Sequence, residues 1–202
     1  DNCSFCQRQT KVLCSRLGGS ICFITYFMAK NLYYLFKEIR PRQWIKNLTL
    51  FAAIFFNGKF FDPHLFQITL VAVLSFCAAS SSIYIINDLT DIEKDRMHPF
   101  KKNRPLASGK LSRKVAGVAL ILLSFAAIYL SASVSTSFLA IVLIYYLLHI
   151  GYSFWLKNII LIDIFTISAG FILRVFAGEV ATGYHLSIWI FLTVVSVALF
   201  LA

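Results

Sequence analysis

Residues 65–96 read LFQITLVAVLSFCAASSSIYIINDLTDIEKDR, and this stretch decides the fold class. Its first part, 65–86, contains no Asp, Glu, Lys or Arg. About 20 apolar residues are enough for an α-helix to cross the hydrocarbon core of a bilayer. The second part, 87–96, changes abruptly to a polar segment with four acidic residues. We therefore expect a membrane-spanning helix that ends in a charged segment facing water.

The whole chain has the composition of a membrane protein. Hydrophobic residues make up 59% of the 202 residues, charged residues make up 14%, and the mean hydropathy is +0.76. Soluble domains usually carry about 25% charged residues, so an ordinary cytosolic enzyme and a disordered chain are excluded. The net charge of +10 comes from basic residues that flank apolar stretches, as in membrane proteins, and we expect no nucleic-acid partner.

Six stretches are apolar and long enough to be candidate spans, and they lie roughly at 44–61, 65–86, 115–133, 137–156, 159–178 and 184–202. None of them alternates between polar and apolar residues, as a strand of a barrel would, so the spans are expected to be helices. The sequence thus predicts an all-α, polytopic membrane helical bundle. Residues 1–35 are expected to be an N-terminal extension. Met28 opens a stretch typical of a natural start, and we therefore expect 1–27 to be an upstream extension or a translation artefact.

The distribution of basic residues predicts the orientation of these spans. Apart from Lys59 and Arg174, the 19 Lys and Arg residues lie before or at the start of the first span, in loop 87–114, or at position 157. Basic residues concentrate on the cytoplasmic side of a membrane. We therefore expect the N-terminus and loop 87–114 on the cytoplasmic face of the cell membrane, where this loop can meet the loop at 157–158.

A candidate metal site lies where the second span ends. If the helix continues, Asn87, Asp91, Asp95 and Asp88 fall at about 0°, 40°, 80° and 100° around its axis and share one face. Carboxylates crowded on one face repel each other, and a divalent cation removes that cost. Oxygen ligands that are completed by substrate phosphates are typical of Mg²⁺. These four residues are therefore predicted to hold Mg²⁺, and the simpler alternative is a set of solvated acidic residues.

Two further groups flank this acidic segment. The run RMHPFKKNR at 96–104 is basic, which suits a diphosphate bound beside a metal but also fits the orientation signal alone. The second group is Tyr152, Lys157 and Asp163. An ionisable residue at membrane depth, such as Asp163, is a candidate functional residue, and the simpler alternative is an ion pair with Lys157.

Several segments resemble those of one family. The pattern NDxxDxxxD at the end of an apolar helix resembles the first signature of the UbiA family of membrane prenyltransferases. Within that family, the similarity is greatest to the decaprenyl-phosphate phosphoribosyltransferases and extends over about 36–202. It is carried by RPRQWIKN at 40–47, NDLTDIEKDRMHPFKKNRPLASG at 87–109, YSFWLKNIILID at 152–163 and AGFILRVFAG at 169–178.

The resemblance implies a fold of about nine transmembrane helices, of which this chain supplies about six, so that 36–202 would be a partial UbiA-like domain. It implies a Mg²⁺-dependent transferase that moves 5-phosphoribose from phosphoribosyl pyrophosphate to a polyprenyl phosphate and releases pyrophosphate. The four predicted metal ligands would hold Mg²⁺ on the diphosphate. The phosphate contacts would be Lys46, Arg96, Lys101 and Arg104, and the catalytic residues would be Tyr152, Lys157 and Asp163.

Two alternatives remain open at the level of the sequence. One is a UbiA-type aromatic prenyltransferase, in which the metal-bound diphosphate belongs to the prenyl donor and the acceptor resembles 4-hydroxybenzoate. The other is a non-enzymatic transporter with Asp163 and Arg174 along its pathway, and this alternative leaves the acidic cluster unexplained. Arg174 can also be a surface residue that extends its guanidinium toward the headgroups.

Overall fold

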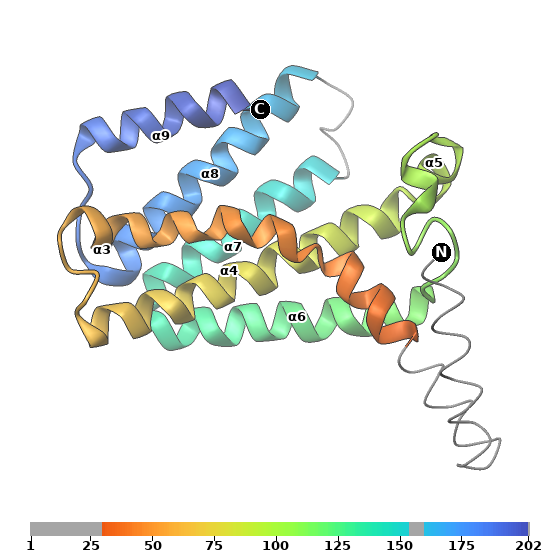
Figure 1. Cartoon of the computed structure of the whole chain (residues 1–202), viewed down its shortest axis with the longest axis horizontal. Coiled ribbons are helices and arrows are strands. Elements are labelled where there is room, and N and C mark those ends of the chain that lie inside the picture. The colour runs from red at the N-terminus through yellow and green to blue at the C-terminus, as the bar shows by residue number, and fades with distance from the viewer. Residues whose placement is uncertain (1–29, 154–159, 202) are drawn as a thin grey trace, which may run out of the picture.

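The computed structural model describes residues 30–153 and 160–201, which form helices and no strand, as the all-α prediction expects. Long helices run side by side, and the short α5 lies at one end of them (Figure 1). A helix at 30–39 comes first, and the elements that follow are η1 (Pro41–Phe51), α3 (Ala52–Phe56), α4 (Pro63–Thr90), α5 (Ile92–Met97), η2 (Lys101–Asn103), α6 (Arg113–Val134), α7 (Thr136–Gly151), α8 (Ile160–Thr182) and α9 (Ile188–Leu201).

Three of the described helices are long and apolar enough to cross a membrane: α4, α6 and the part of α8 at 164–182. The shorter helices α7 and α9 are also apolar. Helix α4 begins after the N-cap residue Asp62, whose side chain accepts hydrogen bonds from the backbone N–H groups of His64 (3.0 Å) and Leu65 (3.3 Å). Pro63 occupies the first helical position, where the missing N–H costs nothing.

The candidate span at 44–61, whose apolar run Asn57 and Lys59 interrupt, is not one continuous α-helix. It consists of the 3-10 helix η1, the five-residue α3 and a turn in which Gly58 has a φ of 66°. Two asparagines hold this segment against its neighbours. The buried Asn47 donates to Cys77 Sγ and Ser80 Oγ on α4, both at 3.3 Å. Asn57 donates to the Ala53 carbonyl at 2.8 Å, at the end of α3, and to the His185 carbonyl at 3.1 Å.

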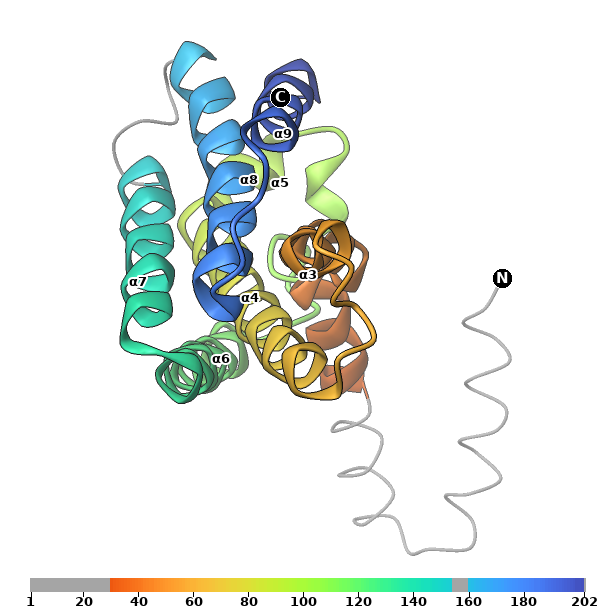
Figure 2. The same cartoon turned by 90° about the vertical axis from the view of Figure 1, so that its left-hand side faces the viewer.

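Helix α4 forms the centre of the bundle and packs against η1, α6, α7 and α8, an arrangement seen end-on in Figure 2. Its Phe76 lies in edge-to-face contact with Phe138 and Tyr145 of α7, with ring centroids 5.8 and 5.3 Å apart. Its Ser75 bonds to the Ala127 carbonyl (3.0 Å) and the Ser131 hydroxyl (2.8 Å) of α6. Small polar side chains between membrane helices stabilise close packing in this way.

A second, smaller apolar cluster holds the polar loop in place. Leu106 and Leu111 of the loop are buried against Ile85 of α4, Ile92 of α5 and Ala116 of α6. Tyr34 and Leu35 of the helix at 30–39 pack on the same cluster, which is therefore shared by five segments. This packing fixes the path of the chain on both sides of Arg104.

Gly178 marks the closest approach of α8 to η1. A Cβ at this position would overlap the carbonyl oxygen of Leu50 and lie 3.1 Å from the Leu50 Cα. Gly178→Ala is therefore expected to lower the free energy of unfolding by about 1–3 kcal/mol, because backbone atoms cannot move aside cheaply.

Thermal unfolding of the detergent-solubilised protein measures this effect. Gly117→Ala in α6 is the matched control, because a Cβ there meets nothing within 4 Å. Equal midpoints for the two variants would contradict the close contact between α8 and η1.

Candidate active site

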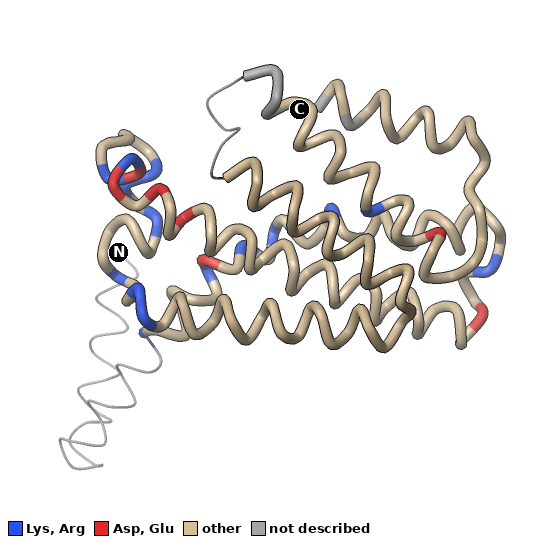
Figure 3. The backbone as a smooth tube through the Cα atoms, turned by 180° about the vertical axis from the view of Figure 1, so that it is seen from behind, with Lys and Arg blue, Asp and Glu red and all other residues tan. Residues whose placement is uncertain are grey.

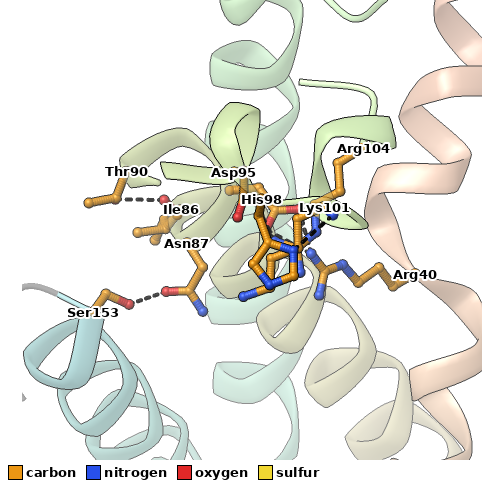
Figure 4. A network of polar contacts seen from close by, with 10 residues as sticks. Arg40, Ile86, Asn87, Thr90, Asp95, His98, Lys101, Arg104 and Ser153 are labelled. Carbon is orange, nitrogen blue, oxygen red and sulfur yellow. Dashed lines mark hydrogen bonds and ion pairs between the residues drawn. The ribbon is translucent and has the colours of Figure 1, made fainter. Parts of the chain in front are cut away.

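Charged residues gather at the end of the bundle where α4 passes into α5 (Figure 3). Asp88 and Asp95 are 3% and 4% exposed, so both carboxylates are buried. Arg104 Nη1 donates to Asp88 Oδ1 at 2.8 Å and to Asp95 Oδ2 at 2.7 Å. Arg40 Nη2 donates to both oxygens of Asp88, at 2.7 and 2.5 Å. Two guanidinium groups thus neutralise two carboxylates at this end (Figure 4).

The shared helical face predicted for the acidic residues is present for Asp88 and Asp95, since both meet one guanidinium. Helix α4 ends at Thr90, and Asp91 departs from helical geometry with φ −103° and ψ 14°. The chain nevertheless keeps helix-like hydrogen bonds there, from the N–H of Asp91 to the carbonyl of Asn87 (3.0 Å) and from the N–H of Asp95 to the carbonyl of Asp91 (2.8 Å). The short break therefore leaves the two buried carboxylates on one side.

Asn87 connects this cluster to α7. The Ser153 hydroxyl donates to Asn87 Oδ1 and also to the carbonyl of His149 at 2.8 Å (Figure 4). Ser153, just after α7, therefore contacts the end of α4, whereas the loop at 157–158 that we expected to meet loop 87–114 lies outside the described residues. Of the three predicted catalytic residues, Tyr152 lies next to this contact. Lys157 and the side chain of Asp163 lie outside what the structure describes.

The four predicted phosphate contacts occupy different surroundings. Arg104 is in the ion-pair cluster. Arg96 points back to the loop, with its Nε donating to the carbonyl of Ala107 at 3.0 Å. Lys101 is exposed. Lys46 lies on η1, with its Nζ 5.7 Å from the centre of the Phe171 ring of α8. The structure therefore brings only Arg104 of these four into hydrogen-bond contact with the acidic pair, as far as the described residues show.

A cavity of about 290 Å³ opens beside the ion pairs. Its wall includes Lys37, Glu38, Arg40, Asp88, Asn103 and Arg104. Sequence reasoning missed Glu38, although a signal was present: Glu38 is the only acidic residue between positions 2 and 61. Burial and the neighbouring Asp88 carboxyl raise the pKa of Glu38 to about 8.

The acidic residues suit a metal only together with a ligand. Within 30–153 and 160–201, no three His, Cys, Asp or Glu side chains lie close enough to hold a metal ion by themselves. Mg²⁺ does not require such a cage, because one or two carboxylates and substrate phosphates are its usual ligands. The oxygens of Asp88, Asp95 and Asn87 fit this donor chemistry.

A separate polar network lies inside the bundle. Arg174 of α8 is 5% exposed and donates to Asn47 Oδ1 (2.8 Å), the Gly170 carbonyl (2.7 Å) and the Tyr145 hydroxyl (2.7 Å). The interpretation of Arg174 as a surface residue that reaches for the headgroups is therefore wrong. Its guanidinium joins η1, α7 and α8.

Comparison with known proteins identifies the class of this bundle. The model of the UbiA prenyltransferase family matches residues 47–202. The chain therefore belongs to the UbiA prenyltransferase family, a family of transferases, and with its apolar helices it is a membrane protein.

Two curated relatives are each 38% identical to this chain and are named decaprenyl-phosphate phosphoribosyltransferase. One is from Corynebacterium glutamicum, with 83% of this chain and 52% of the relative covered, and the other is from Mycolicibacterium smegmatis, with 83% and 54% covered. The chain thus spans about half the length of these relatives.

Solved structures support the fold. A UbiA homologue from Archaeoglobus fulgidus bound to GPP and Mg2+ has a TM-score of 0.68 and 22% identity, with 82% of this chain and 60% of that chain covered. The same homologue bound to DMAPP and Mg2+ has a TM-score of 0.69.

Arg104 is expected to be the stabilising residue of the ion-pair cluster. Arg104→Gln leaves Asp95 without its ion pair and should lower the free energy of unfolding by roughly 2 kcal/mol. This is less than the about 3–5 kcal/mol of a fully buried pair, because the Arg104 side chain is 29% exposed.

Thermal unfolding in detergent with a chelator present measures this loss. The control is Lys102→Gln, which removes an exposed positive charge two residues away. Equal losses in both variants would show that the cluster responds to net charge and not to the specific ion pairs.

Proposed function

We propose that the whole protein transfers 5-phosphoribose from phosphoribosyl pyrophosphate to a polyprenyl phosphate and releases pyrophosphate. The observation that carries this proposal is the convergence of two buried carboxylates and two guanidinium groups around one cavity, at the polar end of membrane-crossing helices. A diphosphate that binds together with a divalent cation needs carboxylates for the cation and guanidinium groups for the phosphate oxygens. The names of the relatives at 38% identity support this choice of donor and acceptor.

The location of the cluster suits the two substrates. A polyprenyl phosphate cannot leave the bilayer, whereas a phosphorylated sugar arrives from water. The cavity lies at the end of α4, where an apolar span meets a charged segment, so it is placed where both substrates can reach it. A site buried in the middle of the spans would not be accessible to the sugar.

The reaction needs little acid–base catalysis from the protein. An oxygen of the lipid phosphate attacks the anomeric carbon, and the bond from that carbon to the pyrophosphate oxygen breaks, with its electron pair leaving on pyrophosphate. The nucleophile is already anionic, so no general base is needed. Arg40 and Arg104 border the cavity and can stabilise the charge that develops on the leaving oxygen.

The metal would be held by Asn87, Asp88, Asp91 and Asp95, whose oxygens suit Mg²⁺. When bound, Mg²⁺ would supply positive charge to the diphosphate. The archaeal homologue, whose structure contains Mg2+, supports this choice of ion. Within the same proposal, Lys46, Arg96 and Lys101 contact phosphates, and Tyr152, Lys157 and Asp163 complete the site from the segment after α7.

The decisive assay uses the full-length protein in membranes with Mg²⁺, polyprenyl phosphate and phosphoribosyl pyrophosphate labelled in the ribose. Label should enter the lipid phase and be lost on chelation. Asp91→Asn should reduce the rate by about 100-fold, because it removes an ionised oxygen ligand. Glu93→Gln is the matched control, since Glu93 is exposed on α5.

Different results would point elsewhere. Transfer that proceeds equally well after chelation, or in Asp91→Asn, would contradict the metal assignment. A protein that inserts into membranes but transfers no ribose, and instead joins a prenyl diphosphate to 4-hydroxybenzoate, would replace this proposal by the aromatic prenyltransferase alternative.

The same proposal places the N-terminus and loop 87–114 on the cytoplasmic face of the cell membrane. Lys102→Cys, in a background without the native cysteines, should react with an impermeant thiol reagent only after permeabilisation. Lys59→Cys, at the other end of α4, should react in intact cells. Lys102 and Lys59 are both exposed, so access by itself does not decide the outcome. The opposite labelling pattern would contradict this orientation.

A further inference from the structure

Two basic side chains inside the bundle have no carboxylate partner within the part of the chain that the structure describes. Arg174 of α8 is 5% exposed, and Lys46 of η1 is half-buried. A buried charge is costly unless an opposite charge or a ligand compensates it. An ionisable residue at membrane depth is therefore a candidate functional residue. An anionic ligand is one way to compensate these two cations.

The two carboxylates of α8 do not supply the missing charge. Asp163 precedes Arg174 by eleven residues, about 16 Å along the helix axis, which is too far for an ion pair. Glu179 follows Arg174 by five residues and so points to a different side of the helix. The hydrogen bonds that Arg174 donates go to an amide oxygen, a backbone carbonyl and a hydroxyl, all of them neutral. These bonds orient the guanidinium group and leave its charge in place.

Lys46 and Arg174 lie against the same aromatic ring. The Lys46 Nζ and the Arg174 Cζ are each 5.7 Å from the centre of the Phe171 ring, and the two charges are close enough to repel each other. Cation–π contacts stabilise a positive charge but do not neutralise it. Phe171 and Lys46 are only half-buried, so a ligand can approach the pair from this side. An anion that bound both the ammonium and the guanidinium group would relieve their repulsion.

This pair is separate from the cavity beside Asp88. Asn47, which accepts from Arg174, also donates to Ser80 on α4 at 3.3 Å. Ser80 precedes Asp88 by eight residues, which is about 12 Å along the helix. The pair therefore lies deeper among the apolar helices than the ion pairs of Asp88. A reaction between two anionic substrates needs cations for each of them, because the attacking and the leaving group both carry negative charge.

We propose that Lys46 and Arg174 form a second anion site inside the bundle, which binds the phosphate monoester of the lipid acceptor. This inference rests on the proposed function and deepens it, because it separates the acceptor site from the cavity of Arg40 and Arg104. The position favours the lipid, since a phosphate on a prenyl chain can enter between apolar helices from the bilayer. The alternative source is the other phosphate monoester of the reaction, the 5-phosphate of the donor sugar, which arrives from water.

A binding measurement tests this site without requiring turnover. Purified full-length protein in detergent is titrated with farnesyl phosphate, ribose 5-phosphate and inorganic pyrophosphate, and protection against thermal unfolding reports each affinity. Lys46→Gln should weaken farnesyl phosphate binding about tenfold or more and leave pyrophosphate binding unchanged, because it removes one cation of the pair. Farnesol, which lacks the phosphate, should bind the variant and the wild type equally. Lys59→Gln is the matched control, since Lys59 is exposed at the other end of α4.

Asn47→Asp distinguishes a ligand site from a purely structural contact. The carboxylate keeps an oxygen for the Arg174 Nε and supplies the missing negative charge. Ser80 and Cys77, which accept from Asn47, can donate to the carboxylate instead, because a hydroxyl and a thiol both carry a hydrogen. The variant should therefore remain folded and yet bind farnesyl phosphate about tenfold or more weakly, because Arg174 is already neutralised. If Arg174 only joined helices, the variant would bind farnesyl phosphate as the wild type does.

Three results would overturn the inference. One is unchanged farnesyl phosphate binding in Lys46→Gln or in Asn47→Asp. Another is an equal loss in Lys59→Gln, which would assign the effect to net charge. The third is a loss of ribose 5-phosphate binding while farnesyl phosphate binding is unchanged, which would assign the pair to the donor. Failure of the wild-type protein to label lipid would overturn the proposed function, while these titrations would still decide the role of Lys46 and Arg174.

Discussion

Two buried carboxylates at the end of a membrane-crossing helix require positive partners, and the polar end of the bundle is built around this requirement. An ionised carboxylate that is buried without compensation is very costly. Asp88 and Asp95 both form ion pairs with Arg104, and Asp88 forms a second ion pair with Arg40. These arginines come from segments far apart in sequence, one just before η1 and one from the loop after η2. The carboxylates therefore help to define where both segments pack.

Parts of this arrangement could be predicted from sequence because they depend on local properties. Length and hydropathy identify α4, α6 and α8, and a spacing of seven residues places Asp88 and Asp95 on one helical face. The features that were missed depend on distant partners. The long-range contacts of Asn47 and Asn57, whose partners lie on α4 and just before α9, cannot be deduced from hydropathy. The pairing of Glu38 with Asp88 is likewise visible only once the fold brings the two segments together.

Two contacts with α8 hold the irregular segment η1 in the bundle. Arg174 hydrogen-bonds Asn47, and Gly178, four residues later and so on the same helical face, lies against Leu50. The first contact gives the buried guanidinium a hydrogen-bond acceptor. The second is possible because Gly178 has no side chain, so the two backbones can touch. A segment without regular α-helical bonding is thus held by one polar contact and one close approach.

The double ion pair of Arg104 determines what kind of ligand the cavity could accept. A free anion that captured this guanidinium would strand Asp88 and Asp95 without their partner, so the exchange would be unfavourable. An anion that arrives with its own divalent cation leaves no such deficit, because the cation can take the carboxylates while the anion takes the arginine. If the proposed function holds, this geometry would favour an anion that arrives together with a divalent cation over a free anion.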